Sequence, residues 1–322
     1  MRPFSAASLI AAALLFCTLV PRASAQVPKL PFPGLKGVPK GFEDFSDPQK
    51  FFDQFFGEGF GGKVDPAELD KVEFTWKEEQ QYGAAQLEAL KRDLKQRKIS
   101  LSEKGKDAQY VARLIAAIRL LMQQQERYRE LHVYLADTDI TDAYTLAGGH
   151  VIVSRGMLDV VGSEAALVCV LGHELSHLDR GHLVRQPKQV KLAQESLKPG
   201  ERGFTFDDFL SKTRAMTGLF RRPFGPDEEL EADRDGITWA YKLGYDPRAL
   251  GDLFDHLAAK NNNPALAFMP AFFRTHPPSG ERKEQVAAVF GELQGTLPRS
   301  ELYLGRQNLQ RRLTKEQKRF AE

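Results

Sequence analysis

The pattern of apolar positions divides the chain into a long helical stretch, a short region of strands and further helices. From about Val64 onward apolar residues recur at helical spacing, and the clearest run is Val111, Leu114, Ile115, Ile118, Leu121 and Met122. Residues three and four apart share one face of a helix, so this face is expected to be buried. Residues 131–135 and 151–154 then predict two short strands, and the glycines at 148–149 predict a turn before the second. The core sheet is therefore expected to be small.

Two later helices carry most of the polar residues of interest. Ser163 is a suitable N-cap for a helix that runs through residues 164–177. A second helix opens after Pro226 with acidic residues in its first turn, where carboxylates favour the positive end of the helix dipole, and ends at Gly244. The Asp-Pro pair at 246–247 predicts the start of another helix. Together these elements indicate an α+β fold that is mainly α.

The N-terminal part of the chain differs in composition from the rest. Residues 1–25 have the form of a signal peptide, so the mature protein is expected to begin at Gln26 and to be exported, either periplasmic or secreted. Their apolar run is shorter than the roughly 20 residues that span a bilayer, which leaves an uncleaved anchor as the weaker alternative. Residues 26–65 are rich in Pro, Gly and Phe and predict a leader or linker; its aromatic residues leave peripheral contact with a membrane open.

The remaining sequence predicts one domain, residues 66–295, followed by a charged C-terminal tail, residues 296–322. Within the domain, residues 185–222 are basic and interrupted by Pro and Gly. They predict either a mobile lid or a fixed cover whose phenylalanines complete the core. Once the signal peptide is removed, Cys169 is the only cysteine, so no internal disulfide is expected.

The overall charge and composition limit the kinds of partner that the protein is expected to bind. The 322 residues carry a formal net charge of only +2, which gives no reason to expect binding to nucleic acid. The sequence also carries no clear oligomerisation signal and no internal repeat that would indicate a solenoid.

The candidate chemistry lies in two pairs of residues with helical spacing. His173 and His177 are four residues apart, so on a helix both rings project from one face and can share a metal, with Glu174 beside a water on that metal. A catalytic zinc takes three protein ligands and keeps one position open. Glu229 and Asp233 are also four apart: one carboxylate can bind the metal while the other accepts the free ring N–H of a ligand histidine. Two such pairs favour one zinc per chain over ordinary buried histidines and a solvated acidic helix start.

The sequence also resembles a known family in five ordered segments between about residues 66 and 290. The matching segments are residues 143–149, 173–177, 229–236, 244–247 and 275–277 with Arg282. They resemble the zinc endopeptidases of the CAAX prenyl endopeptidase, HtpX and BepA type, peptidase family M48. The resemblance implies a zincin-like (gluzincin) metalloprotease domain with a small sheet and an active-site helix, and polypeptide substrates.

The resemblance also implies roles for single residues. Glu229 is expected to be the third metal ligand and Asp233 the partner of a ligand histidine. His276 is expected to be catalytic, contacting substrate or stabilising the oxyanion, and in some relatives an equivalent histidine caps the zinc in a latent state. The alternative for His276 is a structural histidine before a proline turn.

For substrate binding, the resemblance points to the strand after the glycine turn. This strand, with Gly149, Val151 and Val153, is expected to be an edge strand that pairs with the backbone of a peptide, and Arg282 is expected to contact substrate. Two positions depart from the family pattern: Asp142 stands where Asn is usual, and Ala147 where Pro is usual. An ionised Asp142 cannot donate a hydrogen bond as Asn can, so substrate contacts there are expected to differ.

These features predict a zinc-dependent endopeptidase that hydrolyses exported, unfolded or misassembled proteins, with Glu174 as the general base. One alternative is a zinc-containing, chaperone-like binding protein with little proteolysis. The presence of Glu174 argues against it, because a binding protein needs no general base. A second alternative is an exopeptidase, which would need a pocket for a free chain terminus.

Overall fold

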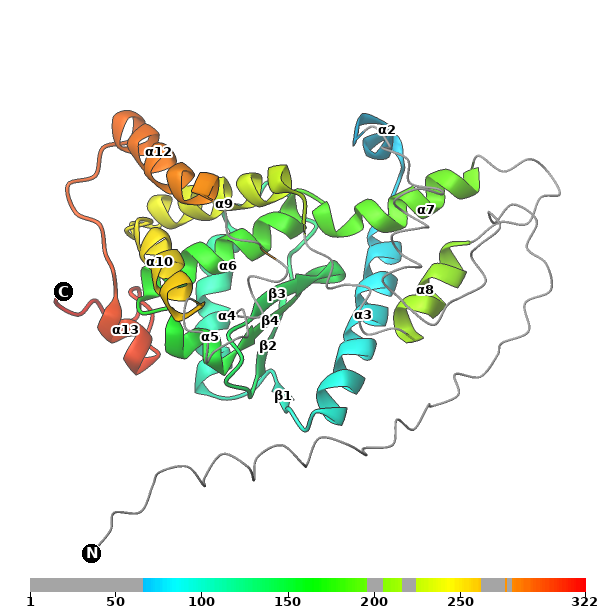
Figure 1. Cartoon of the computed structure of the whole chain (residues 1–322), viewed down its shortest axis with the longest axis horizontal. Coiled ribbons are helices and arrows are strands. Elements are labelled where there is room, and N and C mark those ends of the chain that lie inside the picture. The colour runs from blue at the N-terminus through cyan, green and yellow to red at the C-terminus, as the bar shows by residue number, and fades with distance from the viewer. Residues whose placement is uncertain (1–65, 196–204, 216–223, 262–275, 277–279) are drawn as a thin grey trace, which may run out of the picture. The chain divides into compact units, whose positions relative to one another are not determined.

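The computed structural model describes residues 66–195, 205–215, 224–261, 276 and 280–322. Helices surround a small sheet in this part of the chain (Figure 1). The helices are α2 (Pro66–Lys71), α3 (Trp76–Gln96), α4 (Lys106–Arg119), α5 (Arg155–Val160), α6 (Glu164–Asp179), α7 (Arg185–Glu195), α8 (Phe206–Ala215), α9 (Pro226–Lys242), α10 (Ala249–Asn261), α12 (Gly280–Thr296) and α13 (Arg306–Arg311). The strands are β1 (Leu101–Ser102), β2 (His132–Ala136), β3 (Ala143–Leu146) and β4 (His150–Ser154). The expected mainly helical α+β fold with a small sheet is confirmed.

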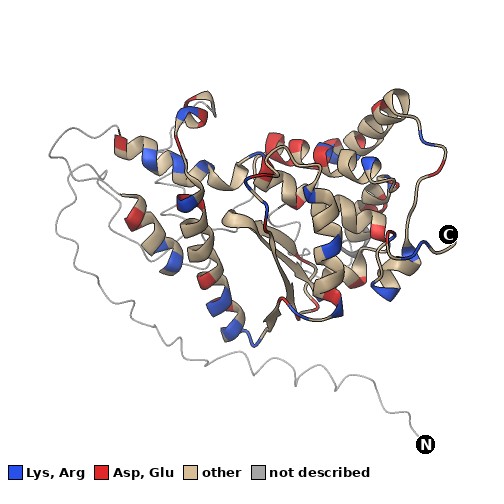
Figure 2. Cartoon of the chain, turned by 180° about the vertical axis from the view of Figure 1, so that it is seen from behind, with Lys and Arg blue, Asp and Glu red and all other residues tan. Residues whose placement is uncertain are grey.

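The sheet has four strands in the order β1-β2-β4-β3. β2 and β4 are parallel, and β1 and β3 are antiparallel to their neighbours. The four strands contain no Lys, Arg, Asp or Glu, so the charged residues lie on the helices and loops around them (Figure 2). The two strands predicted at 131–135 and 151–154 match β2 and β4 to within one residue. β1 and β3 escape the sequence pattern because they have only 2 and 4 residues.

The prediction that the strand after the glycine turn, β4, is an edge strand is wrong. β4 is paired on both sides, with Val151 aligned to Val133 of β2 and to Thr145 of β3. Its main chain therefore cannot pair with a peptide, and the edge strands of the sheet are β1 and β3. The turn at Gly148 and Gly149, with positive φ angles of 71° and 85°, reverses the chain so that β4 pairs with β3, and β2 pairs with the other side of β4.

The helix that carries the two paired histidines, α6, is the centre of the core. The Ser163 hydroxyl accepts a hydrogen bond from the Ala166 N–H at 3.2 Å, which confirms the predicted N-cap. Every residue of α6 is buried, because α4, α9, α10 and the sheet all pack around it. The apolar face predicted for α4 is buried as expected, with Val111, Leu114, Ile115 and Ile118 all at most 2% exposed.

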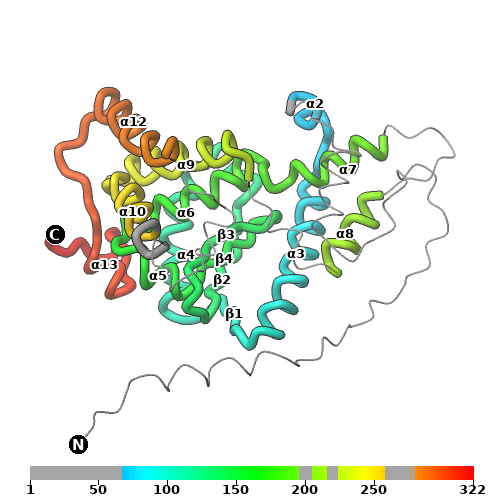
Figure 3. Tube along the Cα trace, in the orientation of Figure 1, coloured from blue at the N-terminus to red at the C-terminus, as the bar shows by residue number. Residues whose placement is uncertain are grey.

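α6 and α9 cross in main-chain contact (Figure 3). A Cβ atom added at Gly172 of α6 would lie 2.8 Å from the Gly236 Cα, and one added at Gly236 would lie 2.6 Å from the Cys169 carbonyl oxygen. Side chains other than hydrogen would force the helices apart. The glycine pair therefore sets the close approach that brings residues of the two helices to one point.

The segment predicted as a lid or cover contributes two helices. α7 and α8 pack beside α3, where Phe209 is buried and its ring lies 5.3 Å from that of Tyr82. Residues 196–204 and 216–222 of the segment lie outside the described residues, so the choice between a mobile lid and a fixed cover stays a prediction. The expected signal peptide and the leader up to residue 65 also lie outside them.

The C-terminal residues predicted as a tail pack against the start of α6. The buried Glu164 carboxylate accepts hydrogen bonds from the hydroxyls of Tyr110 and Tyr245, at 2.8 and 2.7 Å, and from the Lys315 N–H at 2.9 Å. This contact ties residues 297–322 to the N-terminus of the histidine helix. Among the described helices, none is long and apolar enough to cross a membrane.

Candidate metal centre

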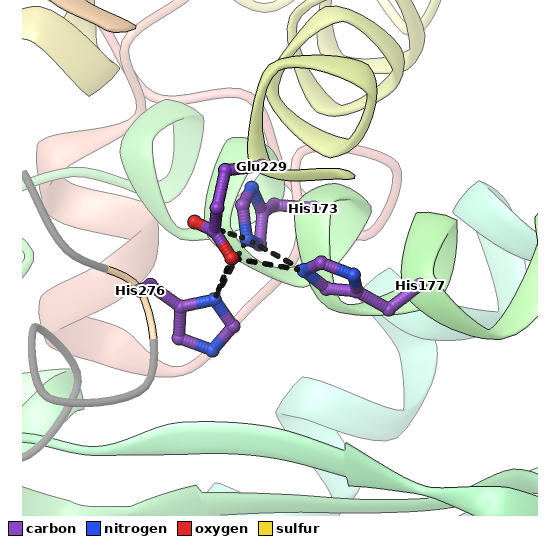
Figure 4. Close-up of side chains that lie close together, drawn as sticks. All are labelled: His173, His177, Glu229 and His276. Atoms are coloured by element: carbon purple, nitrogen blue, oxygen red, sulfur yellow. Dashed lines mark hydrogen bonds and ion pairs between the residues drawn. The ribbon is translucent and has the colours of Figure 1, made fainter. Parts of the chain in front are cut away.

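Four buried side chains bring their donor atoms to one point (Figure 4). His173 and His177 come from α6, Glu229 from the first turn of α9, and His276 from the chain before α12. The His173 Nε2 lies 3.1 Å from the His177 Nε2 and 3.0 Å from the His276 Nδ1, and the His276 Nδ1 lies 3.0 Å from the Glu229 Oε1. All four donor atoms lie within 4.8 Å of one another, so the structure brings together the predicted metal ligands and His276.

The separations between these donors suit a tetrahedral zinc ion. Bonds of about 2.1 Å to zinc place neighbouring ligand atoms of a tetrahedron roughly 3.4 Å apart. The two longest of the quoted separations, from Glu229 to His177 Nε2 and to His173 Nε2, are 3.6 and 3.7 Å. These separations of 3.0 to 3.7 Å bracket the expected value, and no pair of the four donors is more than 4.8 Å apart.

The hydrogen bonds behind the two helix histidines assign which ring nitrogens carry protons. The Asp233 carboxylate lies 2.8 Å from the His173 Nδ1 and accepts its N–H, which leaves the Nε2 of the neutral ring without a proton. Behind His177, Glu231 accepts from the Nε2 of His182 at 3.1 Å, so the His182 Nδ1 accepts from the His177 Nδ1 at 2.9 Å. The His177 Nε2 is then also unprotonated.

This assignment makes the donor set one that calls for a cation. Two unprotonated imidazole nitrogens that face each other at 3.1 Å, with the Glu229 carboxylate beside them, favour a positive charge between them. Although burial acts to raise it, the pKa of Glu229 is held well below its usual range by His173, His177 and His276. The residues present therefore fit a bound divalent metal.

Arg282 lies behind the ligands, among buried carboxylates. Its guanidinium donates to Asp233 at 2.6 and 2.8 Å and to the His276 carbonyl oxygen at 3.1 Å, and forms an ion pair with Glu229 at 2.8 Å. The side chain is only 3% exposed. Its planar fork is occupied by two carboxylates and a carbonyl, so contact of Arg282 with substrate stays a prediction. It supports the position of a ligand and of a ligand's partner.

Glu174 lies between the donor cluster and the edge strand β3. Its Oε1 is 3.2 Å from the His276 Nε2, and a main-chain hydrogen bond from Thr145 of β3 reaches its carboxylate. Burial raises the pKa of Glu174 to about 8, against the effect of His276 and together with the charges of Glu229 and Asp142. A metal ion at the cluster would lower this pKa, because an opposite charge favours the ionised carboxylate.

The other predicted substrate residues lie in the interior. Val151 and Val153 are 0% exposed and belong to the central strand β4, and Gly149 is buried in the turn before it. Phe224, which the sequence gives no signal for, stacks on the His177 ring with centroids 3.7 Å apart and planes at 14°. His182 and Glu231 were not predicted to act at the site either. Their connection to His177 depends on contacts between separate elements, which residue spacing does not reveal.

The centre is closed in this structure. His173, His177, Glu174, Glu229 and His276 are each at most 2% exposed. The ring of Phe224 covers it, because it stacks on the His177 ring and lies 5.7 Å from the His276 ring. A peptide therefore reaches the centre only after a side chain that covers it has moved.

A histidine pair on a buried helix, a carboxylate from a second helix and a small mixed sheet define a zincin-like metallopeptidase. A family model described as Peptidase family M48 matches residues 106–289, which is more than half of the chain. The chain belongs to peptidase family M48. Metallopeptidases of this family use zinc, and the four-donor cluster can hold one such ion.

Curated relatives match slightly less than half of the chain. A beta-barrel assembly-enhancing protease of Yersinia pestis is 28% identical over 155 residues, which are 45% of this chain and 32% of that protein. The mitochondrial metalloendopeptidase OMA1 of Arabidopsis thaliana is 30% identical over 158 residues, 48% of this chain and 30% of that protein. The human mitochondrial metalloendopeptidase OMA1 is 25% identical over 162 residues, which are 47% of this chain and 31% of that protein. The matched region therefore spans about a third of the length of these relatives.

Proposed function

We propose that this chain is a zinc-dependent endopeptidase with His173, His177 and Glu229 as its metal ligands. The observation that supports this most strongly is the hydrogen-bond pattern that leaves both helix histidines unprotonated toward the same point. A glutamate, Glu174, lies beside that point and next to the edge strand. A metal site with a neighbouring general base suits hydrolysis better than binding alone.

In the proposed reaction Glu174 handles the proton. A zinc ion held by the three ligands would supply a Lewis acid and lower the pKa of water from 15.7 to about 7. Glu174 accepts a proton from the attacking water and returns it to the leaving amine. Asp233 and Arg282 keep the ligands oriented behind the reaction centre.

β3 is the strand that we propose to bind the substrate backbone. The Ser154 N–H donates to the Asp142 carbonyl at 2.9 Å, and in an antiparallel pair such bonds involve every second residue. The main-chain groups of Ala143 and Thr145 therefore turn away from β4. In this closed structure the Thr145 N–H donates to the Glu174 carboxylate, and Ala143 and Thr145 are 0% and 5% exposed, so a peptide pairs here only after the cover over the centre has moved. An extended peptide added there would bind through main-chain hydrogen bonds, which tolerate varied side chains.

His276 occupies the position that a hydrolytic water needs. Its Nδ1 is a fourth donor in the cluster, so in this arrangement the centre has no open position. This geometry favours the role of a cap over that of an oxyanion donor. We propose that the structure represents a latent state and that His276 withdraws when substrate binds.

One experiment tests the activity and the cap together. Casein, an unfolded protein, is incubated with the chain from residue 26 onward, as wild type and as His276→Ala, before and after removal of metal with a chelator. We expect slow cleavage by wild type and cleavage at least about tenfold faster by His276→Ala, because an open state of such a protein is typically 0.1–10% populated. Chelation should abolish both activities and added zinc should restore them.

Each other outcome overturns a defined part of the proposal. If neither zinc-loaded protein cleaves casein but both bind it, the chain is a chaperone-like binding protein. If His276→Ala cleaves more slowly than wild type while retaining zinc, His276 is an oxyanion donor and not a cap.

The native substrates and the location of the chain are proposed from its N-terminus and its relatives. We infer that residues 1–25 export the protein and that its substrates are unfolded or misassembled exported proteins. The similarity to the beta-barrel assembly-enhancing protease of Yersinia pestis supports this choice. Peripheral membrane contact through residues 26–65 is part of the same proposal.

A further inference from the structure

We propose that Glu231 and His182 form a positioning pair for His177, which fixes the plane of its ring and the nitrogen that carries its proton. This inference rests on the proposed metal site, since it concerns how one ligand is held toward the metal. Neither residue is a donor to the metal: His182 contacts the ligand His177, and Glu231 acts through His182.

The turn at the end of α6 brings His182 beneath His177. Gly181 has a φ of 71°, a left-handed conformation that ends the helix and folds the short turn 182–184 back along it. The His182 side chain is 0% exposed, and its Nδ1 lies 2.9 Å from the His177 Nδ1. Because His182 is buried, both of its ring nitrogens need partners, and Glu231 supplies the second at 3.1 Å.

The two helix ligands are thus held in two different ways. His173 donates directly to a carboxylate, that of Asp233. His177 donates to a second imidazole, and that imidazole donates to Glu231 on α9. In each case a carboxylate of α9 determines which nitrogen of an α6 histidine faces the metal. The Asp233 carboxylate, which His173 contacts directly, is buried. Glu231 is 46% exposed and lies at the surface end of its chain of hydrogen bonds.

Packing alone does not explain His182. An apolar side chain of similar size would fill the space beside His177, whose opposite face is covered by Phe224. Only a residue with a hydrogen-bond acceptor near the position of the His182 Nδ1 can hold the His177 Nδ1–H. The two explanations predict different results for His182→Leu and His182→Asn, because the Asn amide oxygen sits two bonds from Cβ, as Nδ1 does.

The test measures zinc affinity by competition with a chelating dye, in the chain from residue 26 onward. We expect His182→Leu to weaken zinc binding about 10–100-fold, the usual effect of removing the hydrogen-bond partner of a ligand histidine. His182→Asn should restore affinity to within about threefold of wild type. Thermal unfolding of the metal-free proteins serves as the control, and all three should unfold at similar temperatures.

A double-mutant cycle tests whether Glu231 acts through His182. Glu231→Ala is expected to weaken zinc binding several-fold in the wild type and to have no further effect in His182→Leu. Because Glu231 is partly exposed, this variant is expected to fold even if His182→Leu does not. Unchanged affinity in His182→Leu, failure of His182→Asn to restore it, or additive effects in the cycle would each overturn the positioning pair. A wild-type protein that binds no zinc would instead refute the proposed function itself.

Discussion

Replacing Glu174 by Gln is expected to lower kcat/KM for casein cleavage by roughly 10²–10⁴-fold, the range for loss of a positioned general base. Gln has nearly the same shape, but its neutral amide cannot take a proton from water. Glu174 is not among the four donors of the cluster, so the substitution leaves the proposed ligands in place. Zinc content should therefore stay near that of wild type.

The control for this experiment is a carboxyl group outside the site. Glu292 of α12 has a side chain 57% exposed, and Glu292→Gln should leave both activity and zinc content unchanged. Activity of Glu174→Gln within about tenfold of wild type would show that another group is the base. Loss of zinc from Glu174→Gln would show that Glu174 holds the metal and not only the proton.

Replacing Arg282 by Leu is expected to lower the free energy of unfolding of the metal-free protein by about 3–5 kcal/mol. Arg282 is the cation that faces the buried carboxylates of Glu229 and Asp233, at 2.8 and 2.6 Å. Without it, two negative charges stay in the interior uncompensated, or one must take up a proton to be neutralised. Denaturant unfolding in the presence of chelator measures this loss separately from zinc binding.

Arg234 gives a matched comparison for Arg282. It pairs with Glu292 at 2.9 Å, but both side chains are more than half exposed. Arg234→Leu is expected to change the free energy of unfolding by no more than about 1 kcal/mol, as for other surface ion pairs. Equal effects of the two substitutions would mean that Arg282 does not hold the carboxylates behind the site.

The local features of the site were predictable because helix geometry fixes them. His173 and His177 on α6, and Glu229 and Asp233 on α9, follow from spacing four residues apart on recognisable helices. Caps and breakers such as Ser163 and Gly244 placed the helix ends correctly to within two residues.

Features that depend on contacts between distant segments were not predictable. The edge of the sheet was assigned to β4 from the family resemblance, and only the pairing of β4 with both β2 and β3 shows that it lies elsewhere. Arg282 gives no sign in sequence that its side chain turns inward to two carboxylates. Phe224 and the pair His182 and Glu231 reach His177 only because α6, its terminal turn and the start of α9 pack together.

Elemental analysis of the protein purified without chelator tests the account most directly, since the donor cluster could hold one metal ion. One zinc ion per chain is predicted, with the content falling well below that level in His173→Ala, which removes a donor that lies 3.1 Å from its neighbour. A wild-type protein that carries no stoichiometric transition metal, and takes up no zinc when it is supplied, would contradict the metal site and with it the proposed hydrolysis.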